Sequence, residues 1–125
     1  MTGTSGEQRG QATVELALLL PLVLLLTLSV VQVGLVVHAQ VRTTHAAREA
    51  ARVVAVTHDP AAAEQAAIAA AGLDPARVEV EVEGAIVTGG MVTVRVRYRA
   101  PTTVPMIGAM VDDVALVAEV TMRLE

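Results

Sequence analysis

Cysteine and lysine are absent from the 125 residues, and the aromatic residues are reduced to one tyrosine. Without cysteine the chain has no disulfide, no zinc–thiolate site and no thiolate nucleophile. Because Tyr98 is the one aromatic side chain, valine, leucine and alanine must fill the core, which argues against an enzyme with an aromatic-lined pocket. All nine basic residues are arginine and the formal net charge is −4, so nucleic-acid binding through a basic surface is not expected.

Motifs of catalytic and metal chemistry are also missing from the sequence. No glycine-rich phosphate loop follows a predicted strand, no HExxH segment occurs, and neither Ser5 nor Ser29 lies in a nucleophile motif. His38 and His45 are seven residues apart without further ligands at a suitable spacing, and Asp112–Asp113 lacks the additional oxygen ligands of a calcium site. We therefore predict that the protein is not an enzyme and uses no metal or other cofactor.

A long uncharged stretch is the feature that the sequence has in excess. No charged residue occurs between Glu15 and Arg42, and Leu16–Val37 is almost wholly aliphatic. These 26 residues form a helix about 39 Å long, enough to cross a hydrocarbon core of about 30 Å. The alternative is a buried core helix, but so small a chain offers too few residues to surround a helix that is apolar on every face. The stretch predicts a membrane-spanning helix.

Good helix formers follow the apolar stretch, which predicts one rod from Ala12 to Thr57. Pro21 removes a helical hydrogen bond and predicts a kink between Ala17 and Pro21. Arg48 and Arg52, four residues apart, form either a solvated face or a contact for acidic partner surfaces. The face expected to pack on the rest of the chain consists of Val37, Val41, Thr44, Ala51 and Val54.

The remaining residues predict a short helix and three strands. Asp59–Pro60 is typical of a helix start and Gly72 of a helix end, and Asp74–Pro75 then turns the chain. Strict alternation of apolar and polar residues predicts strands over residues 78–83, 91–99 and 114–125. The fold class is therefore α+β: a long N-terminal membrane-spanning helix and a short second helix packed on a three-stranded antiparallel sheet.

Side-chain parity predicts how the first two strands pair. A three-residue turn, Thr88–Gly90, places Val87 opposite Met91 and keeps the valines on one face. The other face then carries Glu–Arg pairs across the strands. The predicted pairs are Glu83 with Arg95, Glu81 with Arg97, and Glu79 with Arg99. The apolar loop Met106–Val111, before the third strand, is either a core plug or a surface patch for another subunit.

The residues around Gly10 form a motif with the apolar stretch. Glu15 is the fifth residue after Gly10, in the string RGQATVEL, and the aliphatic residues follow directly. A carboxylate at this edge is in itself an ordinary flank of a membrane helix. In combination, the motif resembles a prepilin processing site, and more narrowly the TadE-like minor pilins of tight-adherence (Flp-type) pilus systems. The Ala/Arg-rich segment Ala46–Arg52 is also similar to these proteins, whereas Leu16 stands where such prepilins usually carry an aromatic residue.

The resemblance implies a pilin-like protein with a processed leader. Residues 1–10 would be the leader, cut by a prepilin peptidase between Gly10 and Gln11, and Glu15 would be the carboxylate that sets subunit register in assembly. Residues 11–57 would form the membrane and amphipathic helix, and residues 58–125 a small α+β domain outside the cytoplasm. The implied partners are other pilins and inner-membrane pilus assembly proteins, with the chain either entering a surface pilus or assisting its assembly.

Two other functions remain open at this point. One is an uncleaved, single-pass membrane-anchored binding module, and the other is a subunit that supplies only the anchor of an enzyme complex. Orientation is open as well. Arg9 precedes the membrane helix while three arginines follow it closely, so the positive-inside rule places the carboxyl end in the cytoplasm, opposite to the resemblance.

Overall fold

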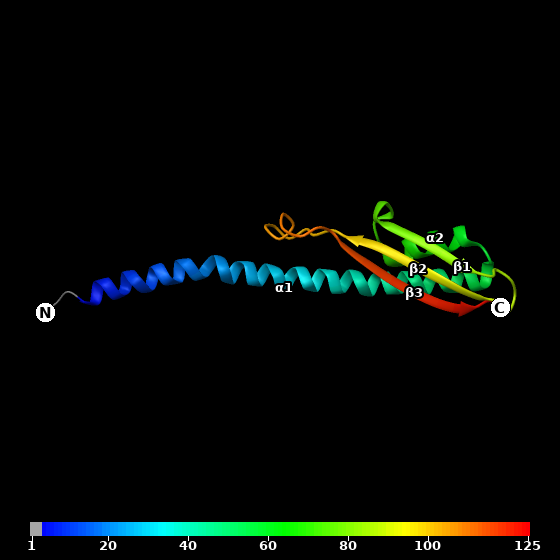
Figure 1. The fold of residues 1–125 in the computed structure, drawn as a ribbon, viewed down its shortest axis with the longest axis horizontal. Helices are drawn as coiled ribbons and strands as arrows, with labels where there is room; N and C mark the ends of the chain where they lie inside the picture. The colour runs from blue at the N-terminus through cyan, green and yellow to red at the C-terminus, as the bar shows by residue number, and fades with distance from the viewer. Residues whose placement is uncertain (1–3) are drawn as a thin grey trace.

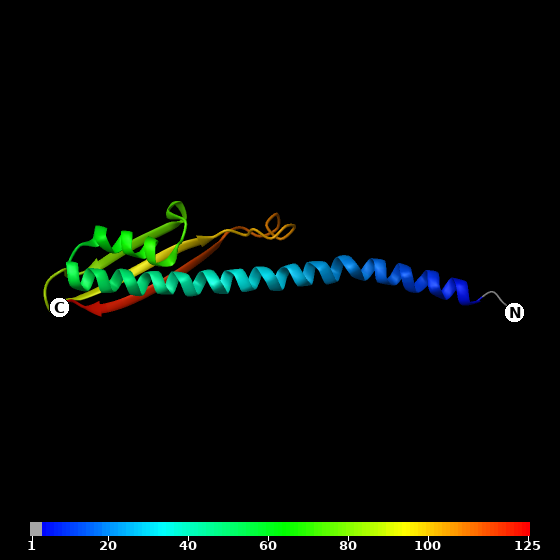
Figure 2. The ribbon, with the colours of Figure 1, turned by 180° about the vertical axis from the view of Figure 1, so that it is seen from behind.

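The computed structural model describes residues 4–125 as a long shaft with a small α+β head at one end (Figure 1). The shaft is α1, and α2 and the sheet surround only its C-terminal part, as Figure 2 shows from behind. This arrangement confirms the predicted α+β fold. In chain order the elements are α1 (Thr4–Thr57), α2 (Pro60–Ala71), a 3-10 turn (Pro75–Arg77), β1 (Val78–Gly84), β2 (Met91–Ala100) and β3 (Val114–Arg123).

The first helix begins earlier than the sequence predicts. It starts at Thr4, not at Ala12, and ends at Thr57 as expected. Once a long apolar helix is nucleated, each further residue adds one hydrogen bond, so the helix extends through Gly6 and Gly10 despite their low propensity. It also continues through Pro21 without interruption, and Figure 1 shows the predicted distortion as a gentle bend of its blue N-terminal part.

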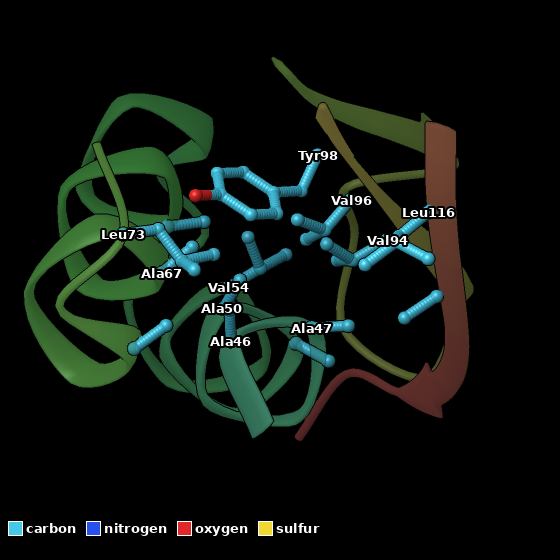
Figure 3. Close-up of a cluster of buried hydrophobic side chains, with 14 of the residues drawn as sticks. Ala46, Ala47, Ala50, Val54, Ala67, Leu73, Val94, Val96, Tyr98 and Leu116 are labelled. Atoms are coloured by element: carbon cyan, nitrogen blue, oxygen red, sulfur yellow. The ribbon is translucent and has the colours of Figure 1, made fainter. Parts of the chain in front are cut away.

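The core of the head lies where α1, α2 and the sheet meet (Figure 3). The two helices contribute alanines, which let their backbones approach closely, and β2 contributes the valines that fill the space between helices and sheet. The Tyr98 ring reaches across this core towards Leu73, on the α2 side. The fully buried apolar helix residues are Ala46, Ala47, Ala50, Ala51, Val54, Ala63 and Ala67, and the polar Thr43 is fully buried as well.

The face of α1 that packs on the head differs in part from the prediction. Ala51 and Val54 are fully buried as expected, and Thr44 is half-buried, but Val37 and Val41 are 57% and 62% exposed. Hydrophobicity alone favoured the valines. Close packing of α1 against α2 and the sheet instead buries the face half a turn away, which is formed mainly by alanines such as Ala46 and Ala50.

The ends of α2 follow the predicted capping signals. The Asp59 carboxylate accepts a hydrogen bond from the Ala61 amide at 2.9 Å, and Gly72 closes the helix with a φ of 57°. Arg42 of α1 adds a tie that the sequence did not reveal. Its guanidinium donates to the carbonyl oxygen of Ala71 at 2.7 Å and to that of Gly72, so it satisfies the last carbonyls of α2 and holds α2 on α1.

The three strands form an antiparallel sheet in the order β1-β2-β3, with the predicted faces but a different register. Glu81 lies opposite Arg95, not Arg97, and the other predicted pairs are also displaced by two residues. The chain leaves the ladder at Gly84, where φ is 122° and a side chain would clash with the Met91 carbonyl, so residues 85–90 form a longer loop. A shift of two residues keeps every side chain on its face, which is why the valines still point inward.

Candidate functional site

The predicted processing residues lie together on the first turns of α1. The spacing of four residues places Gln11 and Glu15 on one face, where the Gln11 amide nitrogen donates to a Glu15 carboxylate oxygen at 3.4 Å. The Thr13 hydroxyl donates to the Arg9 carbonyl at 2.9 Å. Gln11, Glu15 and Gly10 are all exposed, and none of the described residues forms an ion pair with Glu15. The Glu15 carboxylate is therefore free to meet a group from another molecule.

Gly10 lies on an open helical surface. A side chain added there would meet no atom within 4 Å, and the same is true of Gly6 one turn earlier. The Gly10–Gln11 peptide is itself part of the helix. An enzyme that cuts this peptide therefore has free access to it, but must first unwind the turn that contains it.

The first part of the apolar stretch, residues 16–24, is exposed around the whole circumference of α1. Leu18, Leu19 and Leu20 point in different directions around the helix, because successive residues are turned by about 100°, and they are 73%, 53% and 65% exposed. The most apolar 18-residue window of α1 has a mean hydropathy of 2.6 and none of it is buried by the rest of the chain. Because no protein covers this surface and water is a poor solvent for it, the helix is suited to cross a membrane.

Gln32 is the one amide side chain within this stretch, which also contains Thr27 and Ser29, and it was not singled out from the sequence. Its side chain is only 8% exposed, and neither its amide nitrogen nor its amide oxygen has a hydrogen-bond partner among residues 4–125. It lies on the face of α1 that continues through Val36 and Ala39 into the head. The signal that could have identified it is a glutamine in phase with the buried face, because Thr27 and Ser29 can bond to their own helix backbone whereas the longer amide reaches outward.

Arg48 and Arg52 lie on the outward stripe of α1, where Arg52 borders the end of β3 at Met122 and Arg123. Arg48, with Val41 and His45, lines a shallow groove along this stripe. Arg52 is 76% exposed and its one ion pair within the described chain is with Glu49, at 3.9 Å. Both guanidinium groups are thus accessible to a partner, and both are equally compatible with a solvated helix face.

The outer face of the sheet carries a network of charges centred on Arg95. Its guanidinium lies 2.9 Å from Glu119 and 3.5 Å from Glu81, and the hydrogen bond and charge of Glu119 raise the pKa of Arg95. Arg97 has a single partner, Glu81, at 3.4 Å. In the part of the chain that the structure covers, no three His, Asp or Glu side chains converge at a metal-binding geometry. These charges join the three strands of the sheet.

A helix that is suited to cross a membrane and carries a small α+β head fits the class of membrane-anchored proteins. Residues 10–52, about a third of the chain, match the family model described as TadE-like protein. The match confirms the resemblance predicted from Gly10, Glu15 and Ala46–Arg52, and it suggests a role in a tight-adherence pilus system. No curated protein matches the chain. No solved structure matches it either.

Proposed function

We propose that the protein is a minor pilin-like subunit or assembly factor of a tight-adherence pilus, anchored by α1 and processed by a prepilin peptidase between Gly10 and Gln11. The observation that carries the proposal is the position of Gly10 and Glu15. Both lie within the TadE-like segment, five residues apart, on exposed turns directly before an apolar surface that no protein covers. The head is proposed to lie outside the cytoplasm.

The chemistry of such a site follows from the cost of an unpaired charge near lipid. Cleavage after Gly10 turns the Gln11 nitrogen into a positively charged amine at the edge of the apolar stretch. This amine can neutralise the Glu15 carboxylate of a neighbouring subunit when two α1 helices pack side by side. Any other register would leave both charges without a partner in a low-dielectric contact, so the pair selects one arrangement of subunits. The proposed partners are therefore the peptidase, other pilins and the inner-membrane assembly proteins.

The outward stripe that holds Arg48 and Arg52 is the second proposed contact. It lies on the part of α1 that emerges from the membrane, opposite to the side covered by α2 and the sheet. Two arginines four residues apart on one helix face suit an acidic surface of another assembly protein. We therefore propose that α1 makes contacts at both ends of its membrane segment.

The test is the mass of the mature protein in cells that contain the cognate peptidase. The wild-type chain is expected to lose its first ten residues, and a Gly10→Val form is expected to keep them, because a branched side chain at the cleaved position blocks the peptidase. Mass spectrometry of the exported protein reads the outcome directly. An intact Met1 or Thr2 terminus in assembled, exported wild-type protein would contradict the proposal and favour the uncleaved membrane-anchored binding module.

A further inference from the structure

The connection between β2 and β3 exposes a cluster of large apolar side chains, which we call the methionine loop (residues 106–111). Met106, Met110 and Val111 are 55%, 83% and 49% exposed. No charged residue occurs from Pro101 to Val111. Of the two sequence-based alternatives, a core plug or a surface patch for another subunit, the core plug is therefore wrong, and these side chains form a surface patch. Apolar side chains gathered on a protruding tip indicate a surface that is covered by something other than water.

An ion pair and several hydrogen bonds hold the methionine loop in a defined conformation. At its base, Arg77 forms an ion pair with Asp113 at 2.7 Å, and the second Asp113 oxygen accepts from the Thr102 amide at 3.4 Å. Further along, the Gly108 amide donates to the Val104 carbonyl at 3.1 Å, and Val104 itself is only 6% exposed. The loop is thus closed at its base and turned on itself, so its methionines are held outward.

The position of the loop relative to α1 shows what it faces. Figures 1 and 2 both show the orange loop extending beyond the end of the sheet, along α1 towards its N-terminal half. At the base of the loop, Pro101 and Thr103 line a cleft together with Leu35 and Val36 of α1. The tip therefore lies beside the apolar stretch of α1, on the membrane side of Leu35.

On both α1 and the β2–β3 connection, uncharged residues give way to charged ones at the same height along the axis of α1. On α1, the uncharged stretch ends at Arg42, and Arg42 lines the same cleft as Pro101. On the loop, Asp112–Asp113 and Arg77 close the base, while the tip carries no charge. A bilayer that covers the apolar stretch of α1 therefore has its headgroups at the loop base and its acyl chains at the loop tip.

We propose that the methionine loop is a second membrane contact, which inserts Met106, Met110 and Val111 into the leaflet through which α1 emerges. The proposal rests on the membrane anchoring of α1 in the proposed function, but not on a role in a pilus. Lipid is the occupant because the tip is continuous with the surface of α1 that faces lipid and matches it in chemistry. The internal hydrogen bonds at Gly108 and Val111 limit the number of backbone groups that must leave water.

The absence of cysteine from the chain allows a direct test with single-cysteine variants. The full-length protein is inserted into phosphatidylcholine vesicles and labelled with an environment-sensitive fluorophore at Met110→Cys. Quenching is measured with nitroxides on the lipid acyl chains and with iodide in the water. Val87→Cys is the matched control, because Val87 is also an apolar loop residue, 60% exposed, in the β1–β2 loop at the opposite end of the head.

The expected result is that the lipid nitroxide quenches the Met110→Cys label several times more strongly than the Val87→Cys label, and that iodide shows the opposite order. Equal access of iodide to both labels would overturn the proposal. Protection from iodide without quenching by the lipid nitroxide would also overturn it, since protein, such as a second copy of the chain, would then cover the loop. Failure of the labelled chain to float with the vesicles would instead overturn the membrane anchor itself.

Discussion

Single polar side chains on α1 influence how this helix can associate with other molecules, and Glu15 is the clearest case. The helix presents it on an exposed turn, bonded only to the neutral amide of Gln11. A neutral amide does not compensate the charge, so Glu15 enters a dry interface at a cost unless a cation accompanies it. Gln32, further along the apolar stretch, also has an uncompensated polar group, because its buried amide has no hydrogen-bond partner among the described residues. The Glu15 carboxylate therefore favours a subunit arrangement that brings a cation to it, and the Gln32 amide favours one that gives it a hydrogen-bond partner.

Replacing Glu15 by Gln tests the pairing with a neighbour's amine. The amide is similar in size but carries no charge, so a buried amine would lose its partner, and association with other pilins should fall by roughly two to three orders of magnitude. Membrane insertion should be unchanged, because removing a flanking charge makes insertion easier. The measurement is cross-linking to other pilins, with membrane abundance and N-terminal cleavage followed in the same samples.

Glu7→Gln is the matched control for this substitution. Glu7 is an exposed acid on the same helix, but it lies in the segment that cleavage removes, so this change should leave cross-linking unaltered. If Glu15→Gln cross-links as well as the wild-type protein, Glu15 is an ordinary flanking residue and the pairing mechanism is wrong.

Among the elements, the stability of the first turns of α1 is expected to affect how fast the leader is cleaved. Because the Gly10–Gln11 peptide lies inside the helix, its cleavage includes the free energy of unwinding those turns. Glycine makes unwinding easier than alanine does, by about 1 kcal/mol per residue. Gly6 and Gly10 thus weaken the helix at the place where a peptidase has to open it.

Gly6→Ala should slow cleavage by up to about fivefold, because the added side chain favours the helical form and meets no other atom. Gly34→Ala, the same change in an equally open part of α1, should leave the rate unchanged. The measurement is the rate of precursor loss after a pulse of synthesis. Faster processing of the Gly6→Ala form would show that unwinding does not limit cleavage.

The sheet offers a test of its register through its charges. Arg95 contacts Glu81, Glu83 and Glu119, whereas Arg97 contacts one carboxylate. Arg95→Gln should therefore lower the unfolding midpoint of the full-length protein in detergent more than Arg97→Gln does. High salt should reduce the difference, because exposed charges are screened. An equal or larger effect of Arg97→Gln would support the register that the turn at Thr88–Gly90 predicted.

At the scale of the whole molecule, the sequence predicted both helices and all three strands. The errors concern helix packing and the length of the β1–β2 loop. Alternation identified the three strands and their faces, and the capping residues Asp59 and Gly72 located α2. The strand register was wrong because nothing in the pattern shows that the chain leaves the ladder at Gly84. The buried face of α1 was partly wrong because close packing selected alanines over Val37 and Val41. The motif around Gly10 was visible from the sequence, whereas the outward methionine loop required the fold.

The unbroken course of α1 from the membrane into the head has a mechanical consequence. With no hinge between anchor and head, the helix transmits torsion as well as position. Each residue added between them would turn the head by about 100° around the shaft and raise it by about 1.5 Å. The number of residues between the apolar stretch and Arg42 therefore fixes the rotation of the head about the axis of α1. This rotation determines which neighbouring molecules the arginine stripe and the methionine loop face.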